Sequence, residues 1–132
     1  MSRLLIVDDE PHILDVLAEV FAGQGYDVDT AGGGEEALEK MKARCPDLML
    51  LDVRMPGKKG GPETLKQAKQ MHPRMEVIMV TAVRDQDMVR AAMELGASDY
   101  ITKPFDLVHL KAAVRSRLDA AANKAVSQAR SA

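Results

Sequence analysis

The sequence predicts an α/β fold in which a parallel sheet carries helices on both faces, a doubly wound sandwich. Short apolar runs alternate with longer segments whose apolar residues recur at helical spacing, and this β-α order repeats five times. Three of the runs, 4–7, 48–51 and 77–80, are wholly apolar, as strands buried on both faces are. The chain has 132 residues and no linker-like segment rich in proline, serine or charge, so it is expected to form one domain.

The first β-α unit has clear boundaries. After the strand at 4–7, Pro11 suits the first turn of a helix, and apolar residues then recur at helical spacing as far as Phe21. Gly23 and Gly25 bracket the end of this helix. A strand, a turn and a helix therefore follow one another in this unit.

The second unit begins at 26–31, where polar and apolar residues alternate as in a strand with one solvated face. The three glycines at 32–34 lack the Lys-Ser/Thr pair of a phosphate-binding P-loop, so they are interpreted as a turn into the next helix. Glu35 and Glu36 favour the first turn of that helix, and Pro46 prevents its continuation.

The remaining three units follow the same order. Pro73 closes the third helix, and Gly96 ends the fourth. Strands are expected at 48–51, 77–80 and 98–102, and helices from Pro62, from the cap residue Asp85 and from about Asp106.

Composition and charge narrow the class of protein. Hydrophobic residues at 46% and charged residues at 29% are ordinary for a globular domain, and a net charge of −2 gives no electrostatic case for direct binding of nucleic acid. No apolar run approaches the length of a membrane span and no signal-peptide pattern is present, so a cytoplasmic location without a membrane partner is expected. The single Cys45 cannot form an internal disulfide and is expected to be a packing residue.

Polar residues end four of the five predicted strands. They are Asp8 and Asp9 after the first strand, Asp52 after the third, Thr81 after the fourth and Lys103 after the fifth. Because the carboxyl ends of parallel strands share one edge of a sheet, these side chains can meet there although they are far apart in the chain.

Three carboxylates at one edge repel one another. At about 4 Å and an effective dielectric of about 20, each ionised pair costs about 4 kcal/mol, so either cations offset the charge or some of the groups stay protonated. Lys103 supplies one cation, and Mg²⁺ suits a site with few carboxylates. A carboxylate between a metal and a lysine fits phosphoryl transfer, with Asp52 as the nucleophile that forms an acyl phosphate.

Four motifs carry a family resemblance that spans about residues 3–120. They are Val7-Asp8-Asp9-Glu10-Pro11, then Leu51-Asp52-Val53-Arg54-Met55-Pro56-Gly57 with Gly60, then Val80-Thr81-Ala82, then Asp99-Tyr100-Ile101-Thr102-Lys103-Pro104-Phe105. With these motifs the chain resembles the receiver domain of bacterial two-component response regulators, of the chemotaxis-regulator type. The resemblance implies a flavodoxin-like (βα)5 fold with strand order 2-1-3-4-5.

The resemblance also implies a phosphoacceptor and a metal site. Asp52 would accept a phosphoryl group from a histidine kinase or a histidine phosphotransfer protein. Asp9 and Asp52 would bind Mg²⁺ directly, and Asp8 would act mainly through water. The backbone carbonyl of Arg54 would complete the protein ligands. Such a chain is a signalling domain that assists its own phosphorylation and slow dephosphorylation, and not an enzyme in the usual sense.

A switch is implied by the same resemblance. Thr81 would hydrogen-bond the phosphoryl oxygen, and Lys103 would pair with it. Tyr100 would turn inward as Thr81 moves, which would change the face formed by the fourth helix, the fifth strand and the fifth helix. The peptide between Lys103 and Pro104 is expected to be cis.

The last helix extends beyond what the fold needs. Its apolar stripe falls at positions 107, 110, 114, 118, 121 and 125. Residues 1–120 are therefore expected to form the receiver domain, and 121–132 a helical extension or a disordered tail. A frayed tail, a helix leading to an output domain, and a dimer contact remain open. The expected partners include an output domain or effector protein, and a second copy through the switching face.

Two other classes of function share part of this pattern. A hydrolytic phosphatase with an aspartyl nucleophile would form the same intermediate, but such enzymes typically carry Asp-x-Asp on the first strand, whereas Asp8 and Asp9 are adjacent. A phosphorylation-independent scaffold would not need the acid pair together with Asp52, Thr81 and Lys103. The phosphoacceptor is therefore the preferred interpretation.

Overall fold

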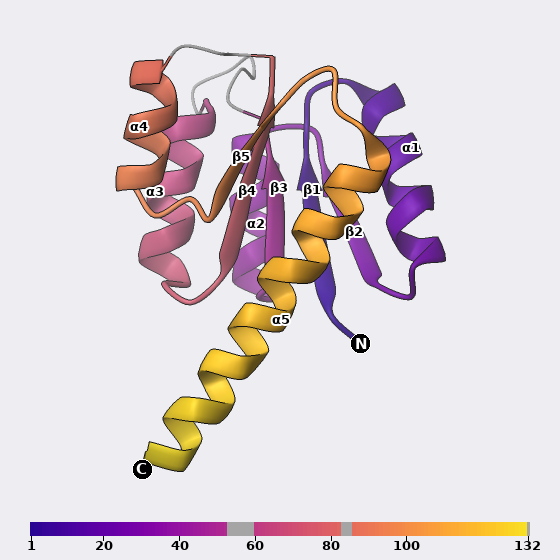
Figure 1. The fold of residues 1–132 in the computed structure, drawn as a ribbon. Helices are drawn as coiled ribbons and strands as arrows, with labels where there is room; N and C mark the ends of the chain where they lie inside the picture. The colour runs from indigo at the N-terminus through magenta and orange to yellow at the C-terminus, as the bar shows by residue number, and fades with distance from the viewer. Residues whose placement is uncertain (53–59, 83–85, 132) are drawn as a thin grey trace.

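The computed structural model describes residues 1–52, 60–82 and 86–131, with side chains as far as residue 122. Five parallel strands form one sheet in the order β2-β1-β3-β4-β5, as predicted (Figure 1). The strands are β1 (Arg3–Val7), β2 (Asp27–Ala31), β3 (Leu48–Leu51), β4 (Glu76–Thr81) and β5 (Asp99–Thr102). The most apolar strand, β3, lies at the centre of the sheet, which is why all four of its residues are buried.

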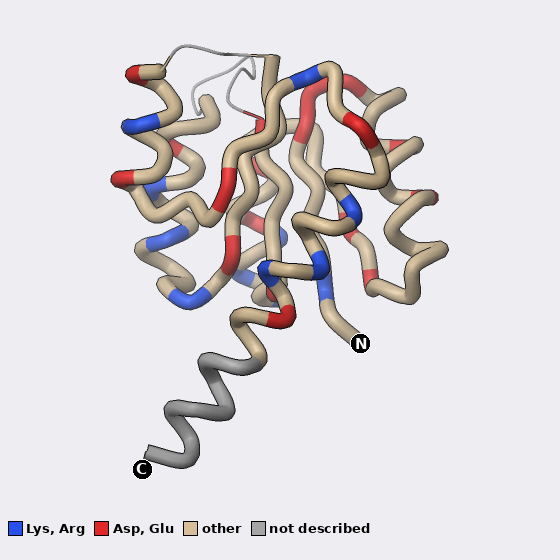
Figure 2. Tube along the Cα trace, in the orientation of Figure 1, with Lys and Arg blue, Asp and Glu red and all other residues tan. Residues whose placement is uncertain are grey.

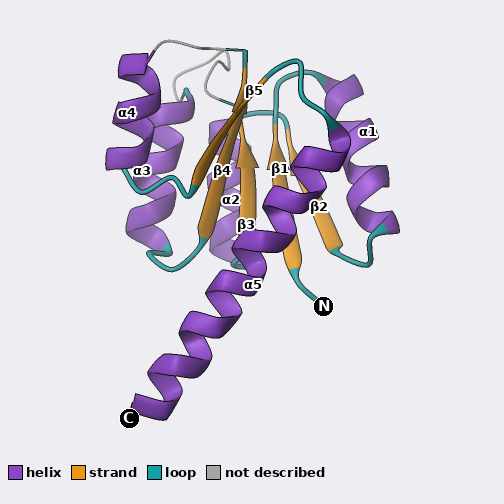
Figure 3. Ribbon diagram, viewed as in Figure 1, coloured by secondary structure: helices purple, strands orange, loops and turns teal. Residues whose placement is uncertain are grey.

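Five helices cover the two faces of this sheet, and α5 crosses it diagonally in Figure 3. They are α1 (Pro11–Gly23), α2 (Gly34–Ala43), α3 (Gly61–Met71), α4 (Gln86–Glu94) and α5 (Leu107–Ser131). One core cluster joins the sheet to α2, α3 and α4, and the other joins it to α1 and α5. Among the described residues, no helix has both the length and the apolar character needed to span a lipid bilayer.

Most predicted helix faces are confirmed, with one exception on α1. Leu17 and Phe21 are buried, but Val16, which shares their spacing pattern, is 37% exposed. On α5, Leu110 and Val114 are fully buried, whereas Leu118 is only partly buried. The apolar stripe of α5 therefore leaves the core after its first half, and the helix continues beyond the sheet (Figure 1).

The backbone ladder continues one residue past the strands and so fixes the positions of the residues that follow them. The N–H of Asp8 donates to the carbonyl of Ala31 at 3.1 Å, and the N–H of Asp52 donates to the carbonyl of Val7 at 3.1 Å. Lys103 donates its N–H to the carbonyl of Thr81 at 2.8 Å. Hydrogen bonds of the sheet therefore fix the backbones of these polar residues, whereas the backbones of loop residues are more mobile.

Gly96 sets the turn between α4 and β5 at the opposite edge. Its φ of +106° lies in the left-handed region that glycine adopts without strain. A Cβ atom there would lie 3.0 Å from Cε of Lys69, whose ammonium donates to the carbonyls of Pro73 and Met75. The predicted role of Gly96 as a helix stop is therefore confirmed, and close packing gives a second reason for the residue.

Candidate functional site

Lys103 lies at the centre of the candidate site and contacts acidic residues from two strands. Its Nζ lies 2.7 Å from Oδ2 of Asp8 and 3.1 Å from Oδ2 of Asp52, and both contacts are hydrogen-bonded ion pairs. Oε1 of Glu10 lies farther away, at 3.8 Å from the same nitrogen. The expected meeting of residues from β1, β3 and the end of β5 at one edge is therefore observed.

Both carboxylates of this arrangement are buried. Asp8 is 3% exposed and Asp52 is 6% exposed, whereas Glu10 is largely open to solvent. Burial alone would lower the pKa of Lys103, but hydrogen bonds and charge attraction from Asp8 and Asp52 outweigh it, so the pKa is raised above its usual value. Lys103 is therefore a permanent cation at neutral pH, and it offsets part of the negative charge at the edge of the sheet.

A cation site is indicated beside this lysine. Asp8, Asp9 and Glu10 each offer a carboxylate oxygen, and these oxygens lie within 4.8 Å of one another. Carboxylate oxygens are the ligands that Mg²⁺ prefers, so the donor set fits a hard divalent cation. Asp9 and Glu10 are exposed, which leaves this side of the site open to solvent.

Glu10 was not predicted as part of the site. Its backbone N–H donates to Oδ1 of Asp8 at 3.0 Å, and Glu10 occupies the N-cap position of α1, just before Pro11, without a side-chain capping hydrogen bond. This turn carries the Glu10 side chain back toward Lys103. Its place directly after the acid pair was a signal in the sequence, but only the geometry of the turn shows that it reaches the lysine.

Thr81 and Tyr100 lie on neighbouring strands near the same edge. Thr81 ends β4, is fully buried, and lies opposite Thr102 in the register of β4 and β5. Tyr100 is partly buried and packs against the core cluster beneath α2, α3 and α4. The peptide between Lys103 and Pro104 is cis, which confirms that expectation. Two predicted residues, the Arg54 carbonyl and the Asp85 cap, lie outside the described residues.

Figure 2 shows how acidic and basic residues are distributed at the carboxyl edge of the sheet. Acidic segments lie at the carboxyl end of β1, and one basic segment lies on the loop after β5 beside them. That loop contains Lys103 as its basic residue. A compact acidic edge held by one internal lysine is suited to bind a cation and then to receive an anionic phosphoryl group.

The comparisons with known proteins decide the family. Residues 4–115 match the family model of the response regulator receiver domain. The chain belongs to the response regulator receiver domains. It is 39% identical over 122 residues to sporulation initiation phosphotransferase F of Bacillus subtilis, a match that covers 92% of this chain and 98% of that protein. A receiver domain protein (CheY-like) from Methanospirillum hungatei JF-1 superposes with a TM-score of 0.91 at 31% identity, covering 94% of this chain and 98% of that one.

Longer relatives are also similar over this receiver domain. The chain is 41% identical over 117 residues to the alkaline phosphatase synthesis transcriptional regulatory protein PhoP of Bacillus subtilis, a match that covers 89% of this chain. It spans only 48% of PhoP and 22% of the DNA-binding transcriptional regulator NtrC of Escherichia coli strain K12. The similarity therefore concerns one domain of these regulators.

Membership of the family defines the general activity. A receiver domain is a phosphoacceptor of two-component signalling that is phosphorylated on an aspartate, binds Mg²⁺, and receives its phosphoryl group from histidine kinases or phosphotransferases. It is a signalling domain rather than an enzyme of the usual kind, so the aspartyl phosphatase alternative is set aside.

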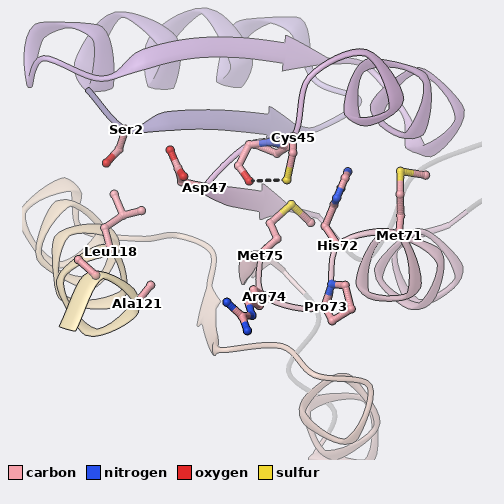
Figure 4. A pocket seen from close by; sticks show the side chains of 12 residues that line it. Ser2, Cys45, Asp47, Met71, His72, Pro73, Arg74, Met75, Leu118 and Ala121 are labelled. Atoms are coloured by element: carbon pink, nitrogen blue, oxygen red, sulfur yellow. Dashed lines mark hydrogen bonds between the residues drawn. The ribbon is translucent and has the colours of Figure 1, made fainter. Parts of the chain in front are cut away.

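A cavity of about 590 Å³ lies at the edge of the sheet opposite the candidate site (Figure 4). It is bounded by the segments that enter β3 and β4 and by the middle of α5, with Leu118 and Ala121 facing Cys45 and Met75 across it. Cys45 is exposed, so its expected role as a packing residue is wrong. In the segment just before β3, Arg44, Cys45 and Asp47 are exposed and Pro46 is buried.

The environment of Cys45 predicts slow alkylation. Although Cys45 as a whole is exposed, desolvation of its thiol and the nearby negative charge of Asp47 raise the pKa of the thiol, against a smaller opposing effect from Arg3. A raised pKa leaves less thiolate at pH 7.5, so iodoacetamide should modify Cys45 several-fold more slowly than free cysteine. The alkylation rate should rise with pH and reach half its maximum at a higher pH than the rate for free cysteine does. Asp47→Asn should increase the rate and Asp29→Asn should not; a rate equal to that of free cysteine would contradict this account.

Proposed function

We propose that Asp52 is the phosphoacceptor of this receiver domain. The observation that carries the proposal is the Lys103 ammonium, which binds the carboxylates of Asp8 and Asp52 at once at the carboxyl edge of the sheet. An oxygen of the Asp52 carboxylate attacks the phosphorus of a phosphohistidine on a kinase or phosphotransfer protein. The new O–P bond forms as the P–N bond breaks, and the imidazole leaves with the electron pair and then takes up a proton.

The residues of the site have separate roles in this proposal. Lys103 orients the Asp52 carboxylate before transfer and pairs with a phosphoryl oxygen afterwards, which stabilises charge that develops on that oxygen. Thr81 donates its hydroxyl hydrogen to another phosphoryl oxygen. Burial of Asp52 limits access of water to the acyl phosphate.

Magnesium would be held by Asp8, Asp9 and Asp52 together with the backbone carbonyl of Arg54. Asp9 and Asp52 would be direct ligands and Asp8 would act mainly through water. The carboxylate oxygens of Asp8 and Asp9 support this proposal because they lie close together beside Lys103. When bound, the cation would neutralise charge on the phosphoryl oxygens during transfer.

We further propose that phosphorylation acts through Thr81 and Tyr100. Movement of Thr81 toward the phosphoryl group would open space for the Tyr100 ring, and this would change the face formed by α4, β5 and α5. Helices α4 and α5 carry the apolar residues Met93 and Val108, which are 45% and 73% exposed and offer apolar surface to a partner. An output domain, an effector protein or a second copy of the chain is the expected partner there, and residues 121–132 would continue from it as a helical extension.

Mass spectrometry tests the proposal. Incubation with acetyl phosphate and Mg²⁺ should add one phosphoryl group to the parent chain and none to Asp52→Asn, because an amide oxygen is too weak a nucleophile to form the acyl phosphate. Asp47→Asn is the matched control, because Asp47 lies at the opposite edge, and it should be labelled as the parent is. Equal labelling of Asp52→Asn and the parent would contradict the assignment.

A further inference from the structure

The two faces of the sheet differ in the flexibility of the side chains that pack on them. The core cluster beneath α2, α3 and α4 contains six of the nine methionines of the chain: Met41, Met49, Met75 and Met79, which are buried, and Met71 and Met88, which are partly buried. Among the described residues, the cluster beneath α1 and α5 contains no methionine and consists of leucine, isoleucine, valine, alanine and aromatic side chains. Adaptable side chains are therefore concentrated on the face that carries α4.

A row of paired residues connects the candidate site with Tyr100 on that face. In the strand register Val7 lies opposite Leu51, Leu51 opposite Met79, and Met79 opposite Tyr100. All four belong to the cluster beneath α2, α3 and α4 or pack against it. Leu51 immediately precedes Asp52, and Met79 precedes Thr81 by two residues and therefore shares its side of β4.

Met79 occupies the middle of this row and is fully buried. Methionine has three rotatable side-chain bonds and no branch, so it can fill different cavity shapes at low cost, whereas branched side chains in a close-packed core resist such changes. Met88 on α4 packs against the same cluster, so Tyr100 lies in a layer with flexible neighbours on a strand and on a helix. The Tyr100 ring can change its position only if the side chains around it can change their conformation, and methionine side chains can do so.

We infer that the methionine layer, with Met79 at its centre, is the part of the core that repacks when the phosphoryl site is occupied, and that Met79 links Thr81 to Tyr100. This inference rests on the proposed switch and adds to it the residues that transmit the change. Met79 is a positioning residue, because it touches neither the phosphoryl group nor the metal. Occupancy of the site selects one arrangement of the layer, and the helix α4 follows.

The two tyrosines of the chain give a direct test. Protein labelled with 3-fluorotyrosine has two ¹⁹F resonances, from Tyr26 and Tyr100, which Tyr26→Phe assigns. Tyr26 lies on the other face, with its ring centre 6.1 Å from that of Phe21, and serves as the internal reference. Beryllofluoride with Mg²⁺ is the probe, because it occupies an aspartate as a tetrahedral mimic of the phosphoryl group.

The variant is Met79→Leu, which conserves volume but replaces a flexible chain by a branched one. The matched control is Ile78→Leu, the next residue of β4, which is equally buried but belongs to the other face. Met88→Leu is a second variant in the same layer in case the first folds poorly. Urea unfolding and acetyl phosphate labelling of Asp52 show whether each variant is folded and phosphorylated.

We expect the shift of the Tyr100 resonance on adding beryllofluoride to fall by about half or more in Met79→Leu, with labelling of Asp52 retained. Ile78→Leu should keep the full shift, and Tyr26 should not respond in any protein. A full Tyr100 shift in both Met79→Leu and Met88→Leu would overturn the inference. A decrease of the Tyr100 shift in Ile78→Leu as large as that in Met79→Leu would overturn it too. Absence of labelling at Asp52 in the parent would instead reject the proposed function, so the two failures are distinguishable.

Discussion

Replacement of Lys103 by methionine is expected to lower the free energy of unfolding by about 3 kcal/mol in EDTA, because it leaves two buried carboxylates without their cation. The Lys103 ammonium lies 2.7 Å from Asp8 and 3.1 Å from Asp52, whose side chains are 5% and 7% exposed. Methionine keeps much of the side-chain volume but removes both ion pairs. Urea unfolding followed by circular dichroism measures the loss.

The stability of the same variant should respond to magnesium in a defined direction. Mg²⁺ should restore part of the stability by replacing the lost positive charge. The control is Lys66→Met, at an exposed position of α3, which should change stability by less than about 0.5 kcal/mol. A Lys103→Met chain as stable as the parent in EDTA would show that the lysine does not offset this charge.

Substitution of Asp9 by asparagine is expected to weaken Mg²⁺ binding by about tenfold or more, because it removes a charged ligand from the acidic group. The stability in EDTA should stay the same or increase slightly, since Asp9 is exposed and its loss relieves repulsion from its acidic neighbours. Isothermal titration calorimetry with MgCl₂ measures the affinity. Asp15→Asn removes an exposed charge from α1, outside the acidic group, and should bind Mg²⁺ as the parent does. Equal affinities in the two variants would place the cation elsewhere.

Much of the site was predictable because it depends on topology. Once strands β1, β3 and β5 are known to be parallel members of one sheet, their following residues Asp8, Asp52 and Lys103 must lie at the same edge. The sheet fixes these residues through backbone hydrogen bonds, so loop conformation has little influence on them. The apolar runs and strand ends therefore carried enough information to bring these residues together.

Other features could not be predicted because they depend on single turns and on tertiary packing. Glu10 approaches Lys103 only through the turn in which its N–H bonds to Asp8. Val16 has the spacing of a core residue, yet the neighbouring elements leave it partly exposed. A hydrophobic pattern gives the face of a helix but not how far the partner surface extends over it.

The methionine layer illustrates a further limit of sequence patterns. In a run such as 48–51 every residue is apolar, so alternation cannot show which residues point to which face. Met49 and Leu51 prove to face α2, α3 and α4, whereas Leu48 and Leu50 face α1 and α5. The abundance of methionine was visible in the composition, but its gathering on one face required the structure.

The most direct test of the central claim is to locate the phosphoryl group chemically. After treatment with acetyl phosphate and Mg²⁺, borohydride reduces an acyl phosphate to the corresponding alcohol, so the modified aspartate becomes homoserine and can be found by peptide sequencing in a mass spectrometer. We predict homoserine at position 52 in the parent chain and at no other aspartate, with none in Asp52→Asn. Homoserine at position 8 or 9, with aspartate unchanged at position 52, would contradict the account.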